Sequence, residues 1–416
     1  MIGQFKFNSL KKSDPILYSL VKKEIKRQQE TLSLIPSENF STGSVLELMG
    51  SPLMNKYSEG YPHKRYYPGN IFYDEIELLA QERLLKVFKL DPKIWSVNVQ
   101  SYSGSPANIA IYQALLEEGD TIMGMSLSSG GHLTHGHKVN FSGKHYKSIQ
   151  YEVDDKGWLD YKKIQELALK YKPKLIISGA TAYPREIDFK KIGNIVKKIR
   201  AYHLADISHI AGLISADCHV SPFSDSDIVM STTHKTLAGP RGAIIFSKLP
   251  LSEKIDKAVF PGVQGGPHNN AIAAKANMAL EIQRANFKKY QRQIVKNAKV
   301  LAESLTKQGF DLLTKGTDNH LMLIDLRKTG LSGKEAEILL EKTGILANRN
   351  SIVGDIKPYL PSGLRLGTPL LTKRGMKEKE MKLISDLIYR VLIKKESILR
   401  IRKEVLDLCK KFPIKY

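Results

Sequence analysis

The sequence predicts an α/β protein built on a mostly parallel, doubly wound sheet. Between residues 95 and 246, short apolar runs alternate with longer stretches of helical periodicity. This alternation is typical of parallel strands that are joined by crossover helices. With 416 residues, of which 42% are hydrophobic, the chain is long enough for one large domain and a second, smaller one.

The part of the chain before this region has mainly helical periodicity. Residues 14–30 have the spacing of an amphipathic helix, with Asp14 as its cap and Pro15 in its first turn. Two polar loops are expected at 34–42 and 55–69, followed by a helix over 71–90. We group residues 1–55 as an N-terminal helical arm at an interface.

Residues 56–284 form the predicted large domain. Its expected strands cover 95–99, 121–125, 174–178, 202–205, 228–231 and 243–246, and its helices include 104–116 and 187–200.

A smaller C-terminal domain is expected over residues 285–416. A long helical pattern over 270–307 leads into it. A strand over 321–326, a helix over 333–343, a polar loop over 348–362 and a basic helical stretch follow.

The chain is strongly basic, with a formal net charge of +22. An excess of this size can mark a nucleic-acid-binding protein. The lysines, however, are spread along amphipathic helical stretches, without the interleaved aromatic residues of single-strand binding proteins. We therefore expect a lysine-rich surface, and we do not expect nucleic acid as the main partner.

The cysteine content argues for a reducing compartment. Cys218 and Cys409 are too few for a disulfide framework or a zinc cluster, and His132 and His135 lack acidic or cysteine partners at ligand spacing. No apolar run suits a signal peptide or a membrane span. We expect a cytoplasmic protein without a metal site.

A lysine stands directly after one of the predicted strands. The strand over 228–231 is followed by small hydroxyl residues, then by His234, Lys235 and a Gly-Pro-Arg-Gly turn. Ligand chemistry in α/β proteins gathers where strands end. Burial disfavours an ammonium and lowers its pKa, which frees the amine to attack an aldehyde. Lys235 is therefore a candidate nucleophile, the alternative being a structural lysine in a turn.

Two further groups follow other predicted strands. Ser103, Gly104 and Ser105 open a helix, so that their backbone N–H groups are placed to hold a phosphate. Asp206 follows the strand over 202–205, where a carboxylate can keep a facing heterocyclic nitrogen protonated. Alone, each also suits a simple capping role. Together, a phosphate cradle, a carboxylate and an amine are what pyridoxal phosphate requires of a protein.

Longer motifs extend this pattern over nearly the whole chain. They read LIPSENF, NKYSEGYP, KRYYPG, GGHLTHG, AYPREIDF, STTHKTLAGPRG, FPGVQGGP, GLSGKEAE and SGLRLGTP. In these motifs the chain resembles the serine hydroxymethyltransferases. The resemblance implies the fold-type I architecture of aspartate aminotransferase, with a mostly parallel, seven-stranded sheet in the large domain and a smaller α+β C-terminal domain.

The resemblance also implies an activity. Family members work at least as homodimers and use pyridoxal 5′-phosphate as cofactor and tetrahydrofolate as co-substrate. They interconvert serine plus tetrahydrofolate with glycine plus 5,10-methylenetetrahydrofolate.

Roles at the cofactor follow from the same resemblance. Lys235 would carry the cofactor as a Schiff base, Asp206 would face its pyridine nitrogen, and His132 would stack on its ring. The other implied cofactor residues are Thr181 and His209 near the phenolic oxygen, Ser103, Gly104 and Ser105 at the phosphate, and Tyr57, Gly265 and Gly266 from the neighbouring subunit. Thr232 and His234 complete the implied catalytic group.

The resemblance assigns substrate-binding positions as well. Arg365, in SGLRLGTP, would clamp the carboxylate of the amino acid, for which a planar guanidinium is suited. Glu59 would be the acid–base residue beside the serine hydroxyl. The remaining implied positions are Ser37 and Tyr67 at the amino acid, and Leu127, Gly131, Leu133, Tyr66 and Asn350 at the folate.

The sequence departs from the family pattern at several positions, which bear on substrate and folate preference. They are Ser101, Tyr102 and Pro106 around the phosphate cradle, Ser129 for a common His, Thr181 for a usual Ser, His63 for a usual Gly, and a loop before Pro361 that is a residue short. The cofactor residues are kept. The alternative to the main expectation is a related aldolase or transaldolase, or an α-methylserine hydroxymethyltransferase.

Overall fold

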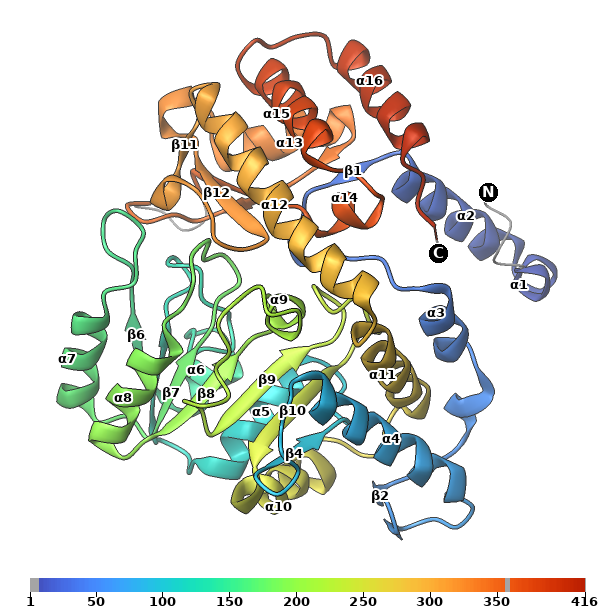
Figure 1. Cartoon of the computed structure of the whole chain (residues 1–416), viewed down its shortest axis with the longest axis vertical. Coiled ribbons are helices and arrows are strands. Elements are labelled where there is room, and N and C mark those ends of the chain that lie inside the picture. Colours follow the sequence, from blue (N-terminus) through green and yellow to red (C-terminus); the bar gives the residue numbers. More distant parts are fainter. Residues whose placement is uncertain (1–6, 356–359, 416) are drawn as a thin grey trace.

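A seven-stranded sheet forms the centre of the computed structural model, which describes residues 7–355 and 360–415 (Figure 1). The strand order is β4-β10-β9-β8-β7-β5-β6. The strands are β4 (Trp95–Asn98), β5 (Thr121–Met125), β6 (Lys147–Tyr151), β7 (Leu175–Ser178), β8 (Tyr202–Asp206), β9 (Ile228–Thr232) and β10 (Ala243–Lys248). All pairs from β9 to β6 are parallel, and β10 is antiparallel to both of its neighbours. The predicted mostly parallel sheet is confirmed.

Helices cover both faces of this sheet. Successive strand residues point to opposite faces, so Ile122 and Met123 of β5 belong to two different apolar clusters. One cluster includes α5 (Gly104–Leu115) and α10 (Leu249–Lys257). The other includes α4 (Ile71–Val87), α7 (Tyr161–Tyr171), α8 (Phe189–Ile199), α9 (Ala211–Ser215) and α11 (Asn269–Ile282). The sheet is therefore doubly wound.

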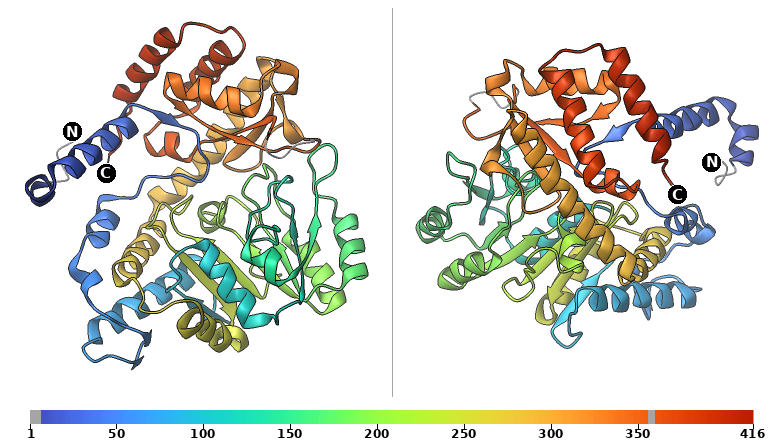
Figure 2. Two further views of the ribbon diagram at one scale, coloured as in Figure 1. Left: turned by 180° about the vertical axis from the view of Figure 1, so that it is seen from behind. Right: turned by 45° about the horizontal axis from the view of Figure 1, so that its top comes forward.

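A second apolar core lies in the C-terminal part of the chain (Figure 2). It includes residues of α12 (Ala285–Lys307), α13 (Gly333–Thr343), α15 (Glu378–Leu392) and α16 (Ile398–Lys411). They accompany an antiparallel sheet of β11 (Asp311–Leu312), β12 (Leu321–Asp325), β15 (Gly363–Gly367) and β14 (Asn348–Asn350).

Part of the N-terminal arm belongs to this second core. β1 (Leu32–Ser33) pairs in parallel with β13 (Ile345–Leu346), and the side chains of Leu32 and Leu34 are fully buried in the C-terminal cluster. Residues 32–34 were expected in the arm because sequence periodicity does not reveal contacts between segments that are far apart in the chain. The domain boundaries at 55/56 and 284/285 stay a prediction.

Short elements complete the described chain. They are α1 (Asn8–Ser13), α2 (Pro15–Gln29), α3 (Gly43–Met49), α6 (Phe141–His145), α14 (Pro369–Lys373), the single turns at Pro52–Asn55, Ala258–Val263, Leu313–Lys315 and Arg327–Thr329, and the strands β2 (Gly60–Tyr61) and β3 (Lys64–Arg65).

The continuous helix that the sequence analysis expected over 270–307 is interrupted. α11 ends at Ile282, and α12 begins at Ala285 after Arg284, whose φ and ψ of −74° and 145° are extended rather than helical. Past this break, Ile294 packs in the core of the large sheet and Leu301 in the C-terminal core. α12 therefore connects the two cores.

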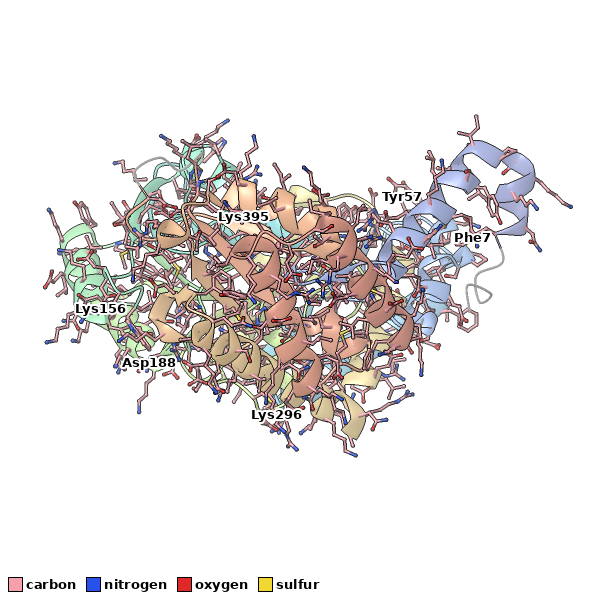
Figure 3. The ribbon with its side chains drawn as sticks, turned by 90° about the horizontal axis from the view of Figure 1, so that it is seen from above. Phe7, Tyr57, Lys156, Asp188, Lys296 and Lys395 are labelled. Atoms are coloured by element: carbon pink, nitrogen blue, oxygen red, sulfur yellow. The ribbon has the colours of Figure 1, made fainter. Side chains whose placement is uncertain are left out.

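The basic residues are distributed over the molecule rather than gathered on one element. Lys156, Lys296 and Lys395 are exposed and lie before α7, on α12 and after α15, respectively (Figure 3). Among the described residues, no helix is both long and apolar enough to cross a membrane.

Candidate active site

A cavity of about 210 Å³ lies where the parallel strands of the large sheet end. Loops that leave neighbouring parallel strands meet at one edge of the sheet, so residues distant in sequence converge there. The lining residues are Ser103, Gly104, Ser105, Asn108, His132, His135, Ala180, Thr181, Asp206, Ser208, His209, Met230, Thr232, His234, Lys235 and Arg241.

Lys235 reaches this cavity from the tight turn between β9 and β10. Thr233 fixes the turn: its N–H donates to Gly242 O at 3.0 Å, and its hydroxyl donates to Pro240 O at 2.6 Å. The carbonyl of Lys235 accepts from the side-chain amide of Asn39 at 2.9 Å. These backbone contacts leave the amine of Lys235 to the cavity.

Asp206 lies at the end of β8 and is only 8% exposed. Its Oδ2 accepts from His135 Nε2 at 3.1 Å and from Asn108 Nδ2 at 3.4 Å, and its Oδ1 accepts from the Ser208 N–H at 3.1 Å. Burial alone would raise the pKa of this carboxyl, but the bond and charge of His135 outweigh it and lower the pKa below its usual 3.8. Asp206 is therefore a carboxylate at neutral pH.

The amine of Lys235 is easier to deprotonate than an ordinary lysine. Its pKa is lowered to about 8, chiefly by burial; the carboxylate of Asp206 acts in the opposite direction, and the guanidinium groups of Arg365 and Arg241 add to the lowering. With this pKa, on the order of a tenth of the molecules carry the neutral, nucleophilic amine at pH 7. The sequence-based expectation of a lysine with lowered pKa agrees with this environment.

The start of α5 forms a polar cradle at the other side of the cavity. Ser103 precedes the helix without making a side-chain capping bond. A Cβ at Gly104 would come within 2.8 Å of Thr232 Cγ2, so the close approach of these two segments requires glycine. Thr232 Oγ1 and His234 Nδ1 are buried and have no hydrogen-bond partner among the described residues. The cradle thus offers both free helix N–H groups and uncommitted side-chain atoms.

His132, Thr181 and His209 also line the cavity. His132 Nδ1 lies 2.7 Å from Thr134 Oγ1, and burial together with the nearby His135 lowers the pKa of its imidazole to about 4. The hydroxyl of Thr181 lies 3.0 Å from Gly131 O and 3.1 Å from Gly130 O. His132 is therefore a neutral ring at pH 7.

Arg365 lies at the edge of the cavity rather than in its lining. From β15, its Nη1 donates to Thr181 O at 2.7 Å and its Nε to Asn348 Oδ1 at 3.1 Å. It is only 9% exposed, and within the described residues it forms no ion pair with a carboxylate. Burial lowers its pKa to about 10, so it stays charged at neutral pH. A buried guanidinium without an anion is a receptor for a carboxylate.

Comparison with known protein families identifies the chain. The family model described as serine hydroxymethyltransferase matches residues 10–388 of 416. The chain belongs to the serine hydroxymethyltransferase family. This family consists of fold-type I, pyridoxal-phosphate-dependent transferases of serine and glycine metabolism, and the seven-stranded sheet agrees with that architecture.

The cavity fits the cofactor of the serine hydroxymethyltransferases. Its glycine-lined cradle and the unpartnered Thr232 Oγ1 suit a phosphate, and the ionised Asp206 suits a protonated ring nitrogen. Lys235, with its lowered pKa, suits the aldehyde. The cofactor residues that the family resemblance implied for one subunit all line this cavity.

Tyr57, Gly265 and Gly266, which the resemblance implied for the neighbouring subunit, form a separate cluster with Tyr67 and Glu59. The rings of Tyr57 and Tyr67 meet edge to face with centroids 5.1 Å apart. A Cβ at Gly266 would lie 3.3 Å from Tyr57, and one at Gly265 would lie 3.3 Å from Glu59 Oε1. These residues do not line the Lys235 cavity of their own chain.

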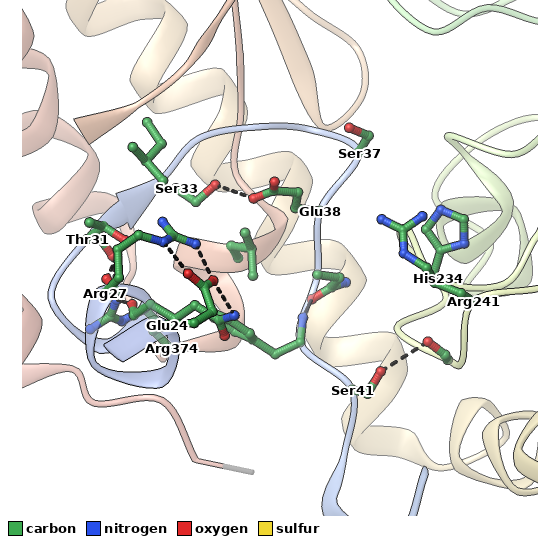
Figure 4. Close-up of a pocket in the computed structure, with 16 residues that line it drawn as sticks. Glu24, Arg27, Thr31, Ser33, Ser37, Glu38, Ser41, His234, Arg241 and Arg374 are labelled. Carbon is green, nitrogen blue, oxygen red and sulfur yellow. Dashed lines mark hydrogen bonds and ion pairs between the residues drawn. The ribbon is translucent and has the colours of Figure 1, made fainter. Parts of the chain in front are cut away.

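Ser37 lies on a second, larger cavity of about 340 Å³ (Figure 4). In this view His234 and Arg241 face the loop that carries Ser37 from the opposite side. Because His234 and Arg241 also line the Lys235 cavity, the two cavities adjoin. Ser37 is therefore near the site, but it does not line the cofactor cavity itself.

The positions implied for folate are only partly brought together. Leu127 and Leu133 are each 40% exposed on the loop after β5, Gly131 O lies 3.0 Å from the Thr181 hydroxyl, and Tyr66 is 73% exposed beside Phe260. Asn350 ends β14, and its side chain bonds to Ser351 O. The loop predicted over 348–362 is wrong at its start, because residues 348–350 pair with β15 as the strand β14. Residues 356–359 of that predicted loop lie outside the described residues.

His135 and Asn108 are site residues that the sequence analysis did not single out. Both donate to Asp206, and His135 is 1% exposed. His135 follows His132 by three residues in the same glycine-rich loop, and this proximity is the signal that could have identified it. Asn108 lies one turn into α5 and carries no sequence signal of its own.

Proposed function

We propose that this protein transfers the hydroxymethyl group of serine reversibly to tetrahydrofolate, giving glycine and 5,10-methylenetetrahydrofolate. One observation carries the proposal: Lys235 and Asp206 line the same cavity, and the guanidinium of Arg365, which forms no ion pair among the described residues, lies at its edge. An amine for an aldehyde, a carboxylate for a ring nitrogen and a cation for an amino-acid carboxylate are thereby present together.

Each group of the chain has a distinct task in this proposal. When bound, pyridoxal phosphate supplies an electron sink that allows a bond at the Cα of an amino acid to break. Asp206, ionised and held by His135, keeps a proton on the nitrogen that faces it. Arg365 binds the amino-acid carboxylate and so orients the bond that breaks. His132 would stack on the cofactor ring, and because its own ring is neutral it would add no charge there.

The proposed enzyme is a homodimer, or a tetramer, with shared sites. Tyr57 and Gly266 would complete the phosphate cradle of the neighbouring chain, and Glu59 would hold or release a proton at the serine hydroxyl there. The exposure of large apolar side chains in this region supports the proposal: Tyr57 is 56% exposed, and Ile71 and Phe72 are 72% and 73% exposed. A second copy of the chain would cover this surface.

We also keep the cytoplasm as the proposed location. Both cysteines, Cys218 and Cys409, are free thiols, as is usual in a reducing compartment.

The proposal is tested by spectroscopy and turnover of the purified protein. Addition of pyridoxal phosphate should give a yellow protein with a visible absorption band, and Lys235→Ala should remove both this band and the turnover. Serine should yield glycine only slowly without tetrahydrofolate and rapidly with it. Equal rates with and without tetrahydrofolate would identify an aldolase instead. A preference for α-methylserine over serine would identify an α-methylserine hydroxymethyltransferase.

A further inference from the structure

A small cavity of about 10 Å³ lies behind the cofactor cavity, on the far side of Asp206 and His209. Its lining comes from the loop between β7 and α8, the end of β8 with the turn that follows it, the loop after α9 and the start of β12, and includes Arg185, His219, Asn319 and His320. This volume accommodates the centre of about one water molecule. Its polar lining residues are Asp206, Arg185, Asn319, His209, His219 and His320, and the last two imidazoles each have a nitrogen without a partner among the described residues.

The first of these rings, His219, presents an acceptor nitrogen. Its Nδ1 lies 3.0 Å from Val220 O, and a carbonyl can only accept, so Nδ1 carries the ring proton. Burial lowers the pKa of this imidazole, which keeps the ring neutral. Its Nε2 is therefore a lone pair, and it has no hydrogen-bond partner among the described residues.

The second ring, His320, joins the small cavity to the active site. Its Nε2 lies 3.2 Å from His209 Nδ1, and the two rings are stacked with centroids 5.4 Å apart. Its Nδ1 is buried, and the described residues offer it no hydrogen bond. Burial lowers the pKa of both rings, that of His320 to about 3. Because both rings are neutral, one of the two facing nitrogens carries a proton and donates it to the other.

The neighbouring side chains are engaged elsewhere. Arg185 donates to Asp318 at 2.7 Å and to Thr314 at 3.0 Å. Asn319 Nδ2 donates to Tyr183 O at 3.0 Å, and its Oδ1 accepts from the Leu321 N–H at 3.0 Å. A buried polar atom without a partner is costly, so the two imidazole nitrogens require a hydrogen-bonding partner that the cavity can hold.

We propose that this cavity binds one ordered water that donates to both His219 Nε2 and His320 Nδ1, and thereby fixes the tautomer of His209. A donation to His320 Nδ1 leaves the proton of that ring on Nε2. His320 Nε2 then donates to His209 Nδ1. The proton of His209 is consequently on its Nε2, on the side of the ring opposite His320. His219 and His320 are thus positioning residues for His209.

The consequence for chemistry depends on the proposed function. An anionic phenolic oxygen of pyridoxal phosphate beside His209 would require an N–H donor. His209 with its proton on Nε2 supplies that donor. In the opposite arrangement His320 would donate to the water, His209 would donate to His320, and a bare nitrogen would face the oxygen. The direction of the hydrogen bond between the water and His320 therefore decides whether His209 presents an N–H donor or a bare acceptor nitrogen to this oxygen.

Neutron diffraction from crystals of the pyridoxal-phosphate-loaded protein tests the proposal directly. We expect one water within hydrogen-bond distance of His219 and His320, and a deuterium on His209 Nε2. A dry cavity, or a deuterium on His209 Nδ1, would overturn the proposal. If the crystals take up no cofactor, the proposed function fails. The neutron map of the same crystals still shows whether the water and its two hydrogen bonds are present, so the two proposals are tested separately.

Variants give a second readout that does not depend on turnover. His219→Phe removes the acceptor and fills the cavity, so we expect a shift in the visible absorption maximum of the bound cofactor, and His219→Gln should restore the wild-type maximum. The matched control is His203→Gln, because His203 is also buried but has both nitrogens partnered, by Ser178 at 2.8 Å and Asp225 O at 2.6 Å. An unchanged maximum in His219→Phe, or an equal shift in the control, would contradict the proposed link.

Discussion

Two buried lysines in this chain have different uses because their hydrogen bonds differ. Burial lowers the pKa of Lys235 to about 8 and that of Lys275 to about 7. Lys275 Nζ donates to three backbone carbonyls, which occupy all of its N–H directions. Lys235 has no such set of acceptors within the described residues, so its amine is available for reaction.

The lowered pKa of Lys235 predicts the pH dependence of cofactor loading. The neutral amine is the reactive form, and its fraction rises with pH until the pKa of about 8 is passed. The rate of pyridoxal phosphate binding to the cofactor-free protein should therefore rise roughly tenfold per pH unit below 8 and level off above it. Stopped-flow absorbance measures this rate. A plateau reached only above pH 10 would indicate an ordinary, exposed lysine.

The buried guanidinium of Arg365 predicts a large effect of a conservative change. Arg365→Lys keeps the charge but removes the planar fork, so we expect a loss of about 1.5–3 kcal/mol in serine binding, or roughly 10- to 150-fold in KM. The visible band of the bound cofactor should persist, since Arg365 does not line the cofactor cavity. Steady-state kinetics with serine measures the loss. An unchanged KM would exclude the proposed carboxylate clamp.

At the scale of the elements, hydrogen bonds from Lys275 connect α11 to the segment after β4 and to the start of β10. Its ammonium lies 2.5 Å from Val99 O, 3.1 Å from Ser101 O and 2.9 Å from Ala243 O, at the end of β4 and the start of β10. Ser101 leads directly into the phosphate cradle at Ser103. α11 therefore supports the cradle from behind.

Removal of this ammonium should weaken the fold and the cradle together. Lys275→Met keeps much of the volume but leaves the three carbonyls without this donor, so we expect a loss of about 2–4 kcal/mol in the free energy of unfolding. Urea denaturation measures it. Lys299→Met on the exposed face of α12 is the matched control, with an expected change within about 0.5 kcal/mol. Equal effects of the two variants would contradict the account.

The elements with clear end signals were predicted well from the sequence. α13 has the predicted bounds of 333–343, because Ser332 forms a capping box with Glu335 and Gly344 ends the helix in a left-handed conformation. The break between α11 and α12 at Arg284 has neither Gly nor Pro, so the periodicity continues through it. The edge strand β6 was not predicted, since only Tyr151 among its residues is fully buried and no apolar run marks it.

At the scale of the whole molecule, the site residues are divided between two surfaces. Lys235, Asp206 and Arg365 belong to one cavity and its edge, whereas Tyr57 and Glu59 lie in an exposed cluster elsewhere on the chain. Their positions after predicted strands pointed to Lys235 and Asp206, because strand ends in a parallel sheet converge, whereas Arg365 came from the family resemblance. The second group came from family resemblance alone, since no periodicity in the sequence encodes a contact between two copies of a chain.

Shared sites predict complementation between inactive variants. Lys235→Ala and Tyr57→Ala subunits should form mixed dimers with one intact site each, and a 1:1 mixture should regain roughly a quarter of wild-type activity after random reassociation. Turnover of serine measures the recovery. A mixture of Lys235→Ala with Asp206→Ala is the control and should stay inactive, because both residues line one cavity of one chain. Recovery in neither mixture would contradict a shared site.

The central claim is that Lys235 binds pyridoxal phosphate covalently in the cavity that Asp206 also lines. Reduction of the cofactor-loaded protein with borohydride, followed by peptide mass mapping, tests it most directly, because reduction fixes the cofactor on the lysine that holds it. The account predicts a single labelled peptide, with the label on Lys235. A label on any other lysine, or a label spread over many of the surface lysines, would contradict it.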